Sequence, residues 1–84
     1  MSIEQLRGQI TQTDAELLRL FDQRMELAAQ IGKLKAAAGM PVFDPAREEV
    51  VLAFAREHSR HPDAAAEMMK TLMRVSRELQ SKPV

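Results

Sequence analysis

An unbroken heptad repeat over the first 38 residues constrains this chain more than any other feature of its sequence. Mostly apolar residues recur at alternating intervals of three and four, at Ile3, Leu6, Ile10, Thr13, Leu17, Leu20, Arg24, Leu27, Ile31, Leu34 and Ala38. This period is typical of one side of an α-helix and not of a strand. Ser2 and Gln5 predict a capping box at its start, and Gly39 followed by Pro41 predicts its end. We therefore expect one helix over about residues 3–38.

A helix of this length is too long for the domain that carries it. It would measure roughly 54 Å at about 1.5 Å per residue. A compact globule of 84 residues is only about 30 Å across. The helix would overhang its own core and leave much of the heptad seam uncovered. We therefore expect a second copy of the chain to cover the seam, in an intertwined homodimer.

Two shorter helices are predicted to follow. Asp44 as N-cap and Pro45 in the first helical position begin a helix over about residues 45–59. The segment SRHPDA separates it from a third helix, over about residues 63–81 and starting near Pro62 or Asp63. The residues predicted to be buried are Val50, Val51, Leu52, Phe54, Ala55, Ala65, Met68, Met69, Leu72, Met73, Val75 and Leu79. The predicted fold class is all-α, with residues 1–84 forming one domain of three helices.

The composition argues against several classes of function. Twelve basic and twelve acidic residues give a net charge of zero, and Trp and Tyr are absent, so we expect no nucleic-acid binding. No apolar run is long enough to span a membrane, and the start MSIEQLRGQI does not resemble a secretory signal, so we expect a cytoplasmic protein. Cysteine is absent, which excludes thiol catalysis. His58 and His61 have no further ligand in metal spacing, so we interpret them as surface residues and expect no metal site.

Charged residues on the heptad seam point to a binding site. Arg24 lies on the seam between Leu20 and Leu27, where a buried charge needs a partner. Lys35 lies eleven residues later and returns to nearly the same face, so both side chains could bend toward one small anion. Alternatively, Arg24 pairs with a carboxylate across the dimer interface. Arg7 lies about 26 Å from Arg24 along the helix and is either a solvated surface residue or part of the partner chain's site.

Polar residues also continue the apolar faces of the two shorter helices. Ser76 and Gln80 extend a stripe that begins with two methionines, and Arg47 and Glu48 lie at the start of the second helix. Together with the cations of the first helix, they suggest a pocket for a small dianion that carries a hydroxyl group. No nucleophile and base stand in an evident pair. Such a pocket would act by positioning and electrostatics rather than by covalent chemistry.

The ordered set of these residues resembles the all-helical class of chorismate mutase. The resemblance runs from Leu6 to Gln80 and rests on LR, on D.ELL.LF..RM.LA..IG.LK...G.PVFDPAREE and on SRELQ. It implies an intertwined dimer of three-helix chains with two shared active sites. It also implies an isomerase that converts chorismate to prephenate, the branch step toward phenylalanine and tyrosine, without metal or cofactor.

The resemblance assigns the substrate's carboxylates to a group of polar side chains. Arg24 and Arg47 of one chain would bind a carboxylate, and Arg7 would reach in from the partner chain. Ser76 would complete the wall near a carboxylate. Holding both ends of a flexible dianion would select its compact, reactive conformer.

The remaining site residues are assigned to the ether oxygen and the ring hydroxyl. Lys35 and Gln80 would donate hydrogen bonds to the ether oxygen, and Lys35 would also touch a carboxylate. Glu48 and the backbone of Asp44 would hold the hydroxyl. Because the C–O bond breaks ahead of C–C bond formation, negative charge develops on the ether oxygen, and these donors would bind the transition state more tightly than the ground state.

Other functions on the same fold remain open at this stage. Some relatives of this class act on isochorismate as a pyruvate lyase or on aminodeoxychorismate as a mutase, although Gln80 together with Glu48 favours chorismate. A non-catalytic helical dimer that senses the same ligand is a further alternative. Since the chain ends soon after Gln80, we expect either a free-standing enzyme or a domain from a fusion or complex with another aromatic-pathway enzyme.

Overall fold

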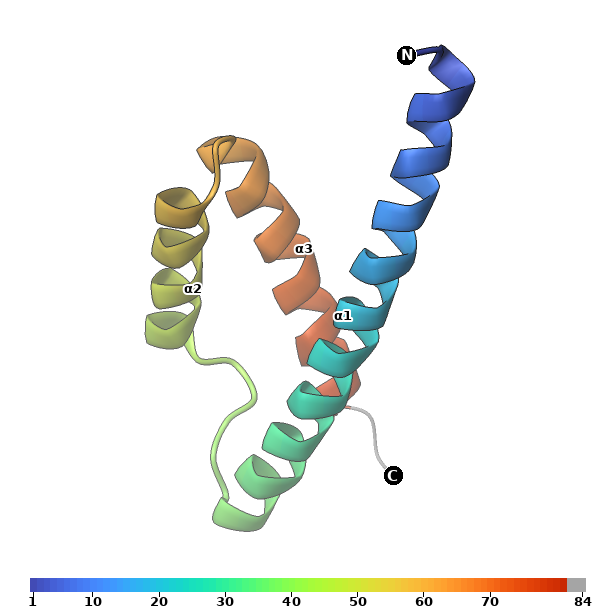
Figure 1. Ribbon diagram of the computed structural model, residues 1–84. Coiled ribbons are helices and arrows are strands. Elements are labelled where there is room, and N and C mark those ends of the chain that lie inside the picture. The colour runs from blue at the N-terminus through green and yellow to red at the C-terminus, as the bar shows by residue number, and fades with distance from the viewer. Residues whose placement is uncertain (82–84) are drawn as a thin grey trace.

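The computed structural model describes residues 1–81, which form three α-helices and no strand. They are α1 (Ile3–Ala38), α2 (Pro45–His58) and α3 (Pro62–Ser81). Figure 1 shows α2 and α3 side by side, with α3 also packed against the C-terminal half of α1. The all-α class predicted from the sequence is confirmed.

Local signals set the helix ends. Ser2 and Gln5 form the predicted capping box, and Gly39 takes the left-handed conformation, with φ of 67°, that ends α1. Asp44 accepts a hydrogen bond from the backbone N–H of Arg47 at 3.1 Å and so caps α2. Helix α2 ends at His58, one residue earlier than predicted, because Ser59 already has extended backbone.

Helix α1 packs on α3 through small residues. Ala28 and Gly32 are its buried residues, and neither belongs to the heptad seam. A Cβ atom on Gly32 would lie 2.9 Å from Cγ and 3.2 Å from Cα of Gln80. Only a residue without a side chain therefore permits this close approach of the two helices.

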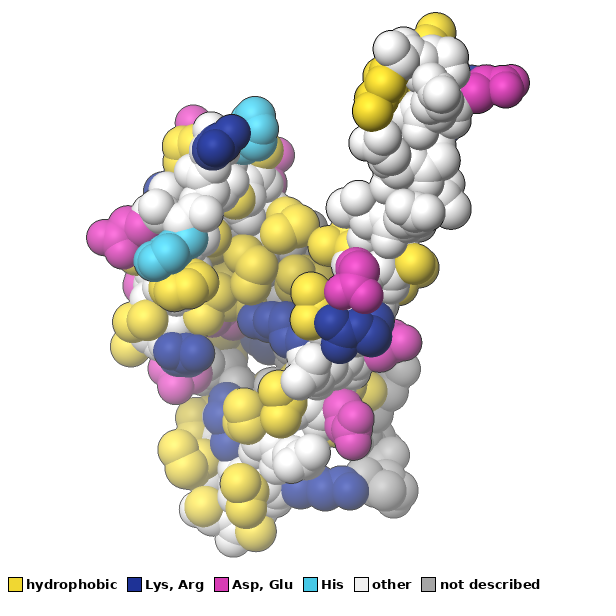
Figure 2. Space-filling model, viewed as in Figure 1, with side chains coloured by type: hydrophobic (Ala, Val, Ile, Leu, Met, Phe, Trp, Pro, Cys, Tyr) yellow, Lys and Arg dark blue, Asp and Glu magenta, His cyan; other side chains and the backbone are white. Residues whose placement is uncertain are grey.

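The apolar seam of α1 remains exposed in the single chain. Its large residues keep between 46% and 71% of their surface accessible, at Ile3, Leu6, Ile10, Leu17, Leu20, Leu27, Ile31 and Leu34. The N-terminal half of α1 extends away from the other two helices, and the molecule measures 54 × 28 × 14 Å. Figure 2 shows hydrophobic side chains along this projection and on the surface between α2 and α1. The seam is therefore free for the second chain that the sequence predicts.

The core is smaller than the sequence predicted. Leu52, Ala66 and Met73 form its buried cluster. Val50, Phe54 and Met68 were predicted to be buried, but they are 56%, 61% and 48% exposed. In the single chain these three face away from the α2–α3 contact, because Val50 and Phe54 lie about 200° around α2 from Leu52, and Met68 about 200° around α3 from Ala66. Within residues 1–81, no helix is long and apolar enough to cross a membrane.

Candidate active site

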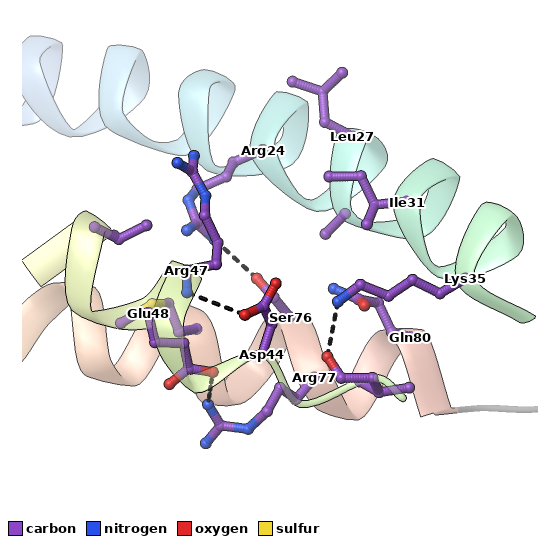
Figure 3. A pocket seen from close by; sticks show the side chains of 14 residues that line it. Arg24, Leu27, Ile31, Lys35, Asp44, Arg47, Glu48, Ser76, Arg77 and Gln80 are labelled. Carbon is purple, nitrogen blue, oxygen red and sulfur yellow. Dashed lines mark hydrogen bonds and ion pairs between the residues drawn. The ribbon is translucent and has the colours of Figure 1, made fainter. Parts of the chain in front are cut away.

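An open cavity of about 360 Å³ lies among the three helices and the connection between α1 and α2. Its walls include every site residue predicted from the sequence except Arg7, namely Arg24, Lys35, Asp44, Arg47, Glu48, Ser76 and Gln80. Apolar groups such as Leu27 and Ile31 complete the lining. Residues far apart in the sequence thus meet around one space, as Figure 3 shows.

Arg24 is held in this space by α3. Its Nη1 donates a hydrogen bond of 2.8 Å to Oγ of Ser76, whose own hydroxyl donates to the Leu72 carbonyl at 2.8 Å. Burial, and to a smaller extent the charge of Arg47, lowers the pKa of Arg24. Within residues 1–81, Arg24 forms no ion pair with a carboxylate. Arg24 and Arg47 thus line the same cavity, and neither is in an ion pair among residues 1–81, which favours an anionic ligand.

Lys35 connects the end of α1 to the segment that follows it. Its Nζ donates a hydrogen bond of 2.8 Å to the carbonyl oxygen of Val42. Figure 3 shows the side chain running back along α1 toward the cavity. An ammonium group has three donors, so this bond fixes the position of the charge and leaves donors for a ligand.

Gln80 presents a carboxamide to the cavity from the last turns of α3. Its Oε1 is buried and has no hydrogen-bond partner among the described residues. Buried polar atoms are nearly always paired, and an unpaired one in a cavity wall often marks a functional group. The backbone of Gly32 lies directly against this side chain and limits where it can move.

The first turn of α2 contributes a cation and a carboxylate. Because Asp44 caps this turn, Arg47 and Glu48 both reach the cavity wall. Arg47 is exposed, whereas Glu48 is half-buried and forms an ion pair with Arg77 of α3. Sequence reasoning did not single out Arg77. The one signal in the sequence for Arg77 is its place in SRELQ, a stretch that also contains the predicted site residues Ser76 and Gln80.

Arg7 does not join this cavity. It lies exposed on the part of α1 that extends away from the other helices. Its predicted contribution to a partner chain's site stays a prediction.

The fold and the cavity together define a class of site. Cations from α1 and α2 and a carboxamide from α3 surround a space of small-molecule size. Among the described residues that line it, no nucleophile is paired with a base. This is a helical anion-binding site suited to positioning and electrostatic stabilisation. The chain matches the family described as chorismate mutase type II over residues 6–81, and it belongs to that family.

The chain is also similar to individual proteins. The chain is 33% identical to a T-protein of Haemophilus influenzae, over 87% of this chain and 19% of the relative. It is 39% identical to a bifunctional chorismate mutase/prephenate dehydratase of Aquifex aeolicus, over 58% of this chain and 14% of the relative. It is 24% identical to a chorismate mutase of Methanocaldococcus jannaschii, over 93% of this chain and 83% of the relative. The chain thus spans about a fifth or less of the first two relatives and most of the third.

Proposed function

We propose that this chain is a chorismate mutase, an isomerase that rearranges chorismate to prephenate in aromatic amino acid biosynthesis. The observation that carries the proposal is the set of cations from α1 and α2 around one cavity, in a chain of the chorismate mutase type II family. Chorismate is a small dianion with a ring hydroxyl, and it matches the charge and the mixed polar lining of the cavity.

Binding of the two carboxylates is the first part of the mechanism. Arg24 and Arg47 would hold carboxylate groups, with Ser76 keeping the Arg24 guanidinium in place through the bond of 2.8 Å. Arg24 is half-buried and, within residues 1–81, has no ion pair, so it attracts a dianion more strongly than a fully solvated cation does. Fixing the carboxylates would hold the enolpyruvyl chain over the ring, which brings the reacting carbon atoms together.

Stabilisation of the ether oxygen is the second part. Lys35 and Gln80 would donate hydrogen bonds to this oxygen as the C–O bond breaks and its negative charge grows. The place of the Gln80 carboxamide in the cavity wall, where its N–H groups can donate, and the fixed position of the Lys35 ammonium support these roles. Donors that meet charge present mainly in the transition state raise kcat rather than ground-state affinity. Glu48 and the Asp44 backbone would hold the ring hydroxyl.

A homodimer with shared sites belongs to the same proposal. The exposed apolar seam of α1 and the open side of the cavity support a second chain whose Arg7 would reach the substrate.

The bifunctional relative supports a further proposal, that this chain works in a fusion or complex with another aromatic-pathway enzyme. Such a biosynthetic role would be cytoplasmic.

Turnover of purified protein tests the proposed function. The loss of chorismate absorbance should be followed and the product identified by mass spectrometry. Prephenate is expected, whereas release of pyruvate would indicate lyase chemistry, and binding without turnover would indicate a ligand sensor. Lys35→Ala should lower kcat at least about a hundredfold, on the scale of a lost oxyanion donor. Lys33→Ala, which removes an exposed cation two residues away, should leave kcat unchanged.

A further inference from the structure

Arg77 is a charged residue of the cavity wall to which the proposed mechanism gives no role. It follows Ser76 on α3, lines the cavity and keeps only 33% of its side chain exposed. Its Nη1 donates to Oε2 of Glu48 on α2. The other ion pairs of the described residues join neighbouring turns of one helix at the surface, so this pair is distinguished by linking two helices inside the cavity wall.

The aromatic ring of Phe43 holds the same guanidinium from another side. The Arg77 Cζ atom lies 5.4 Å from the centre of that ring, within the range of a cation–π contact. Phe43 belongs to the connection between α1 and α2, so Arg77 is fixed by groups from two different segments. Its Nη1 is thereby committed to Glu48, and the guanidinium carbon lies near the Phe43 ring.

The pairing changes what Glu48 can do in a site for anions. A free carboxylate beside a dianionic ligand would repel it, but the charge of Arg77 compensates the charge of Glu48. Because Arg77 bonds to Oε2, Oε1 is left to accept a hydrogen bond. The Glu48 side chain is only 23% exposed, so solvent screens the pair less than it screens a surface ion pair.

We infer that Arg77 is a positioning residue for Glu48: it neutralises and orients this carboxylate so that its free oxygen accepts the hydroxyl hydrogen of a dianionic substrate. The inference rests on the proposed function, because it takes chorismate as the ligand. It predicts an effect on substrate binding and a small effect on the chemical step, since the hydroxyl contact is the same in ground and transition states.

Kinetics of three variants test this role. Arg77→Met removes the charge and keeps much of the length, and it should raise KM for chorismate about tenfold or more while kcat changes less than about threefold. Arg77→Lys restores the charge without the planar fork and should recover part of the affinity. Arg74→Met is the matched control, since Arg74 lies on the same helix and pairs with Glu78 on an exposed surface. Its KM and kcat should equal those of the parent.

The Glu48→Gln background separates positioning from general structural support. A neutral amide needs no countercharge, so Arg77→Met added to Glu48→Gln should raise KM by less than about threefold beyond Glu48→Gln alone. If the increases in KM caused by Arg77→Met and by Glu48→Gln multiply in the double variant, the inference is wrong. The double variant also removes both charges of the pair, so it keeps the test decisive if Arg77→Met alone does not fold.

The outcomes distinguish this inference from the proposed function. If the parent converts chorismate and Arg77→Met matches Arg74→Met in KM, the positioning role is wrong and the proposed function stands. If the parent binds chorismate without converting it, the same comparison is made with Kd from calorimetry. If the parent neither binds nor converts chorismate, the proposed function and this inference both fail.

Discussion

Replacing Gly32 by Ala should impair catalysis and leave the protein folded. The added Cβ would lie 2.9 Å from Cγ, 3.1 Å from Cβ and 3.2 Å from Cα of Gln80. Carbon atoms in contact normally stay about 3.5–4.0 Å apart, so α3 must move by roughly 0.5–1 Å. A new rotamer cannot relieve the contact, because Cα and Cβ of Gln80 are part of it.

The expected effects on stability and on kcat can be estimated separately. Overpacking of this kind costs about 1–3 kcal/mol, while replacing Gly by Ala inside a helix regains about 1 kcal/mol. The free energy of unfolding should therefore fall by no more than about 2 kcal/mol. A displacement of about 1 Å in a catalytic group lowers the rate by up to about a hundredfold, so we expect kcat to fall about 10- to 100-fold.

The assay combines steady-state kinetics on chorismate with urea unfolding, and Gly8→Ala serves as the control. Gly8 lies on the same helix, and a Cβ there meets nothing within 4 Å. Gly8→Ala should gain about 1 kcal/mol in stability and keep the parent's kcat. If Gly32→Ala folds and its kcat stays within about threefold of the control, the close contact does not position Gln80 for catalysis, and the reasoning fails.

Three further predictions concern the cations and the carboxamide. Gln80→Glu should be active only at pH values where the new carboxyl is protonated and can donate, and a pH–rate profile equal to the parent's would contradict this. Because burial disfavours the charged form of Arg24, Arg24→Met should raise the thermal midpoint in calorimetry while kcat/KM collapses; a lower midpoint would show that the charge stabilises the fold. Arg7→Ala and Arg47→Ala proteins should each be nearly inactive, but refolding them as an equal mixture should restore about a quarter of the sites. No recovery despite heterodimers seen by mass spectrometry would exclude the shared site.

The helices could be predicted because their ends depend on short local signals. The capping box at Ser2, the left-handed Gly39 and the Asp44 cap each involve residues within a few positions of one another. The buried positions were harder to predict, because they depend on which face each helix turns to its neighbour. The sequence pointed to the large apolar residues of the seam, whereas the buried residues of α1 are Ala28 and Gly32, whose small size allows the close contact with α3.

The cavity residues also divide into those that local sequence patterns predict and those that depend on how the helices pack. Arg24 stood out because a charge interrupted an apolar seam, and Lys35 because helical spacing returned it to the same face. The pairing of Glu48 with Arg77 joins residues 29 positions apart and depends on the register between α2 and α3. No local pattern encodes that register, so the ion pair could be recognised only in three dimensions.

The arrangement of the helices has a consequence for hydrogen exchange. Among residues 1–81, α3 packs against both other helices, but α1 and α2 make no helix-to-helix contact with each other. A dianion held by Arg24 of α1 and Arg47 of α2 would supply the connection that the chain lacks. At a ligand concentration of about 100 Kd, linkage adds about 2.7 kcal/mol to the free energy of opening. Backbone amides of α2, which is supported on one side only, should then gain more protection than those of α3, so the substrate would act as part of the protein's core.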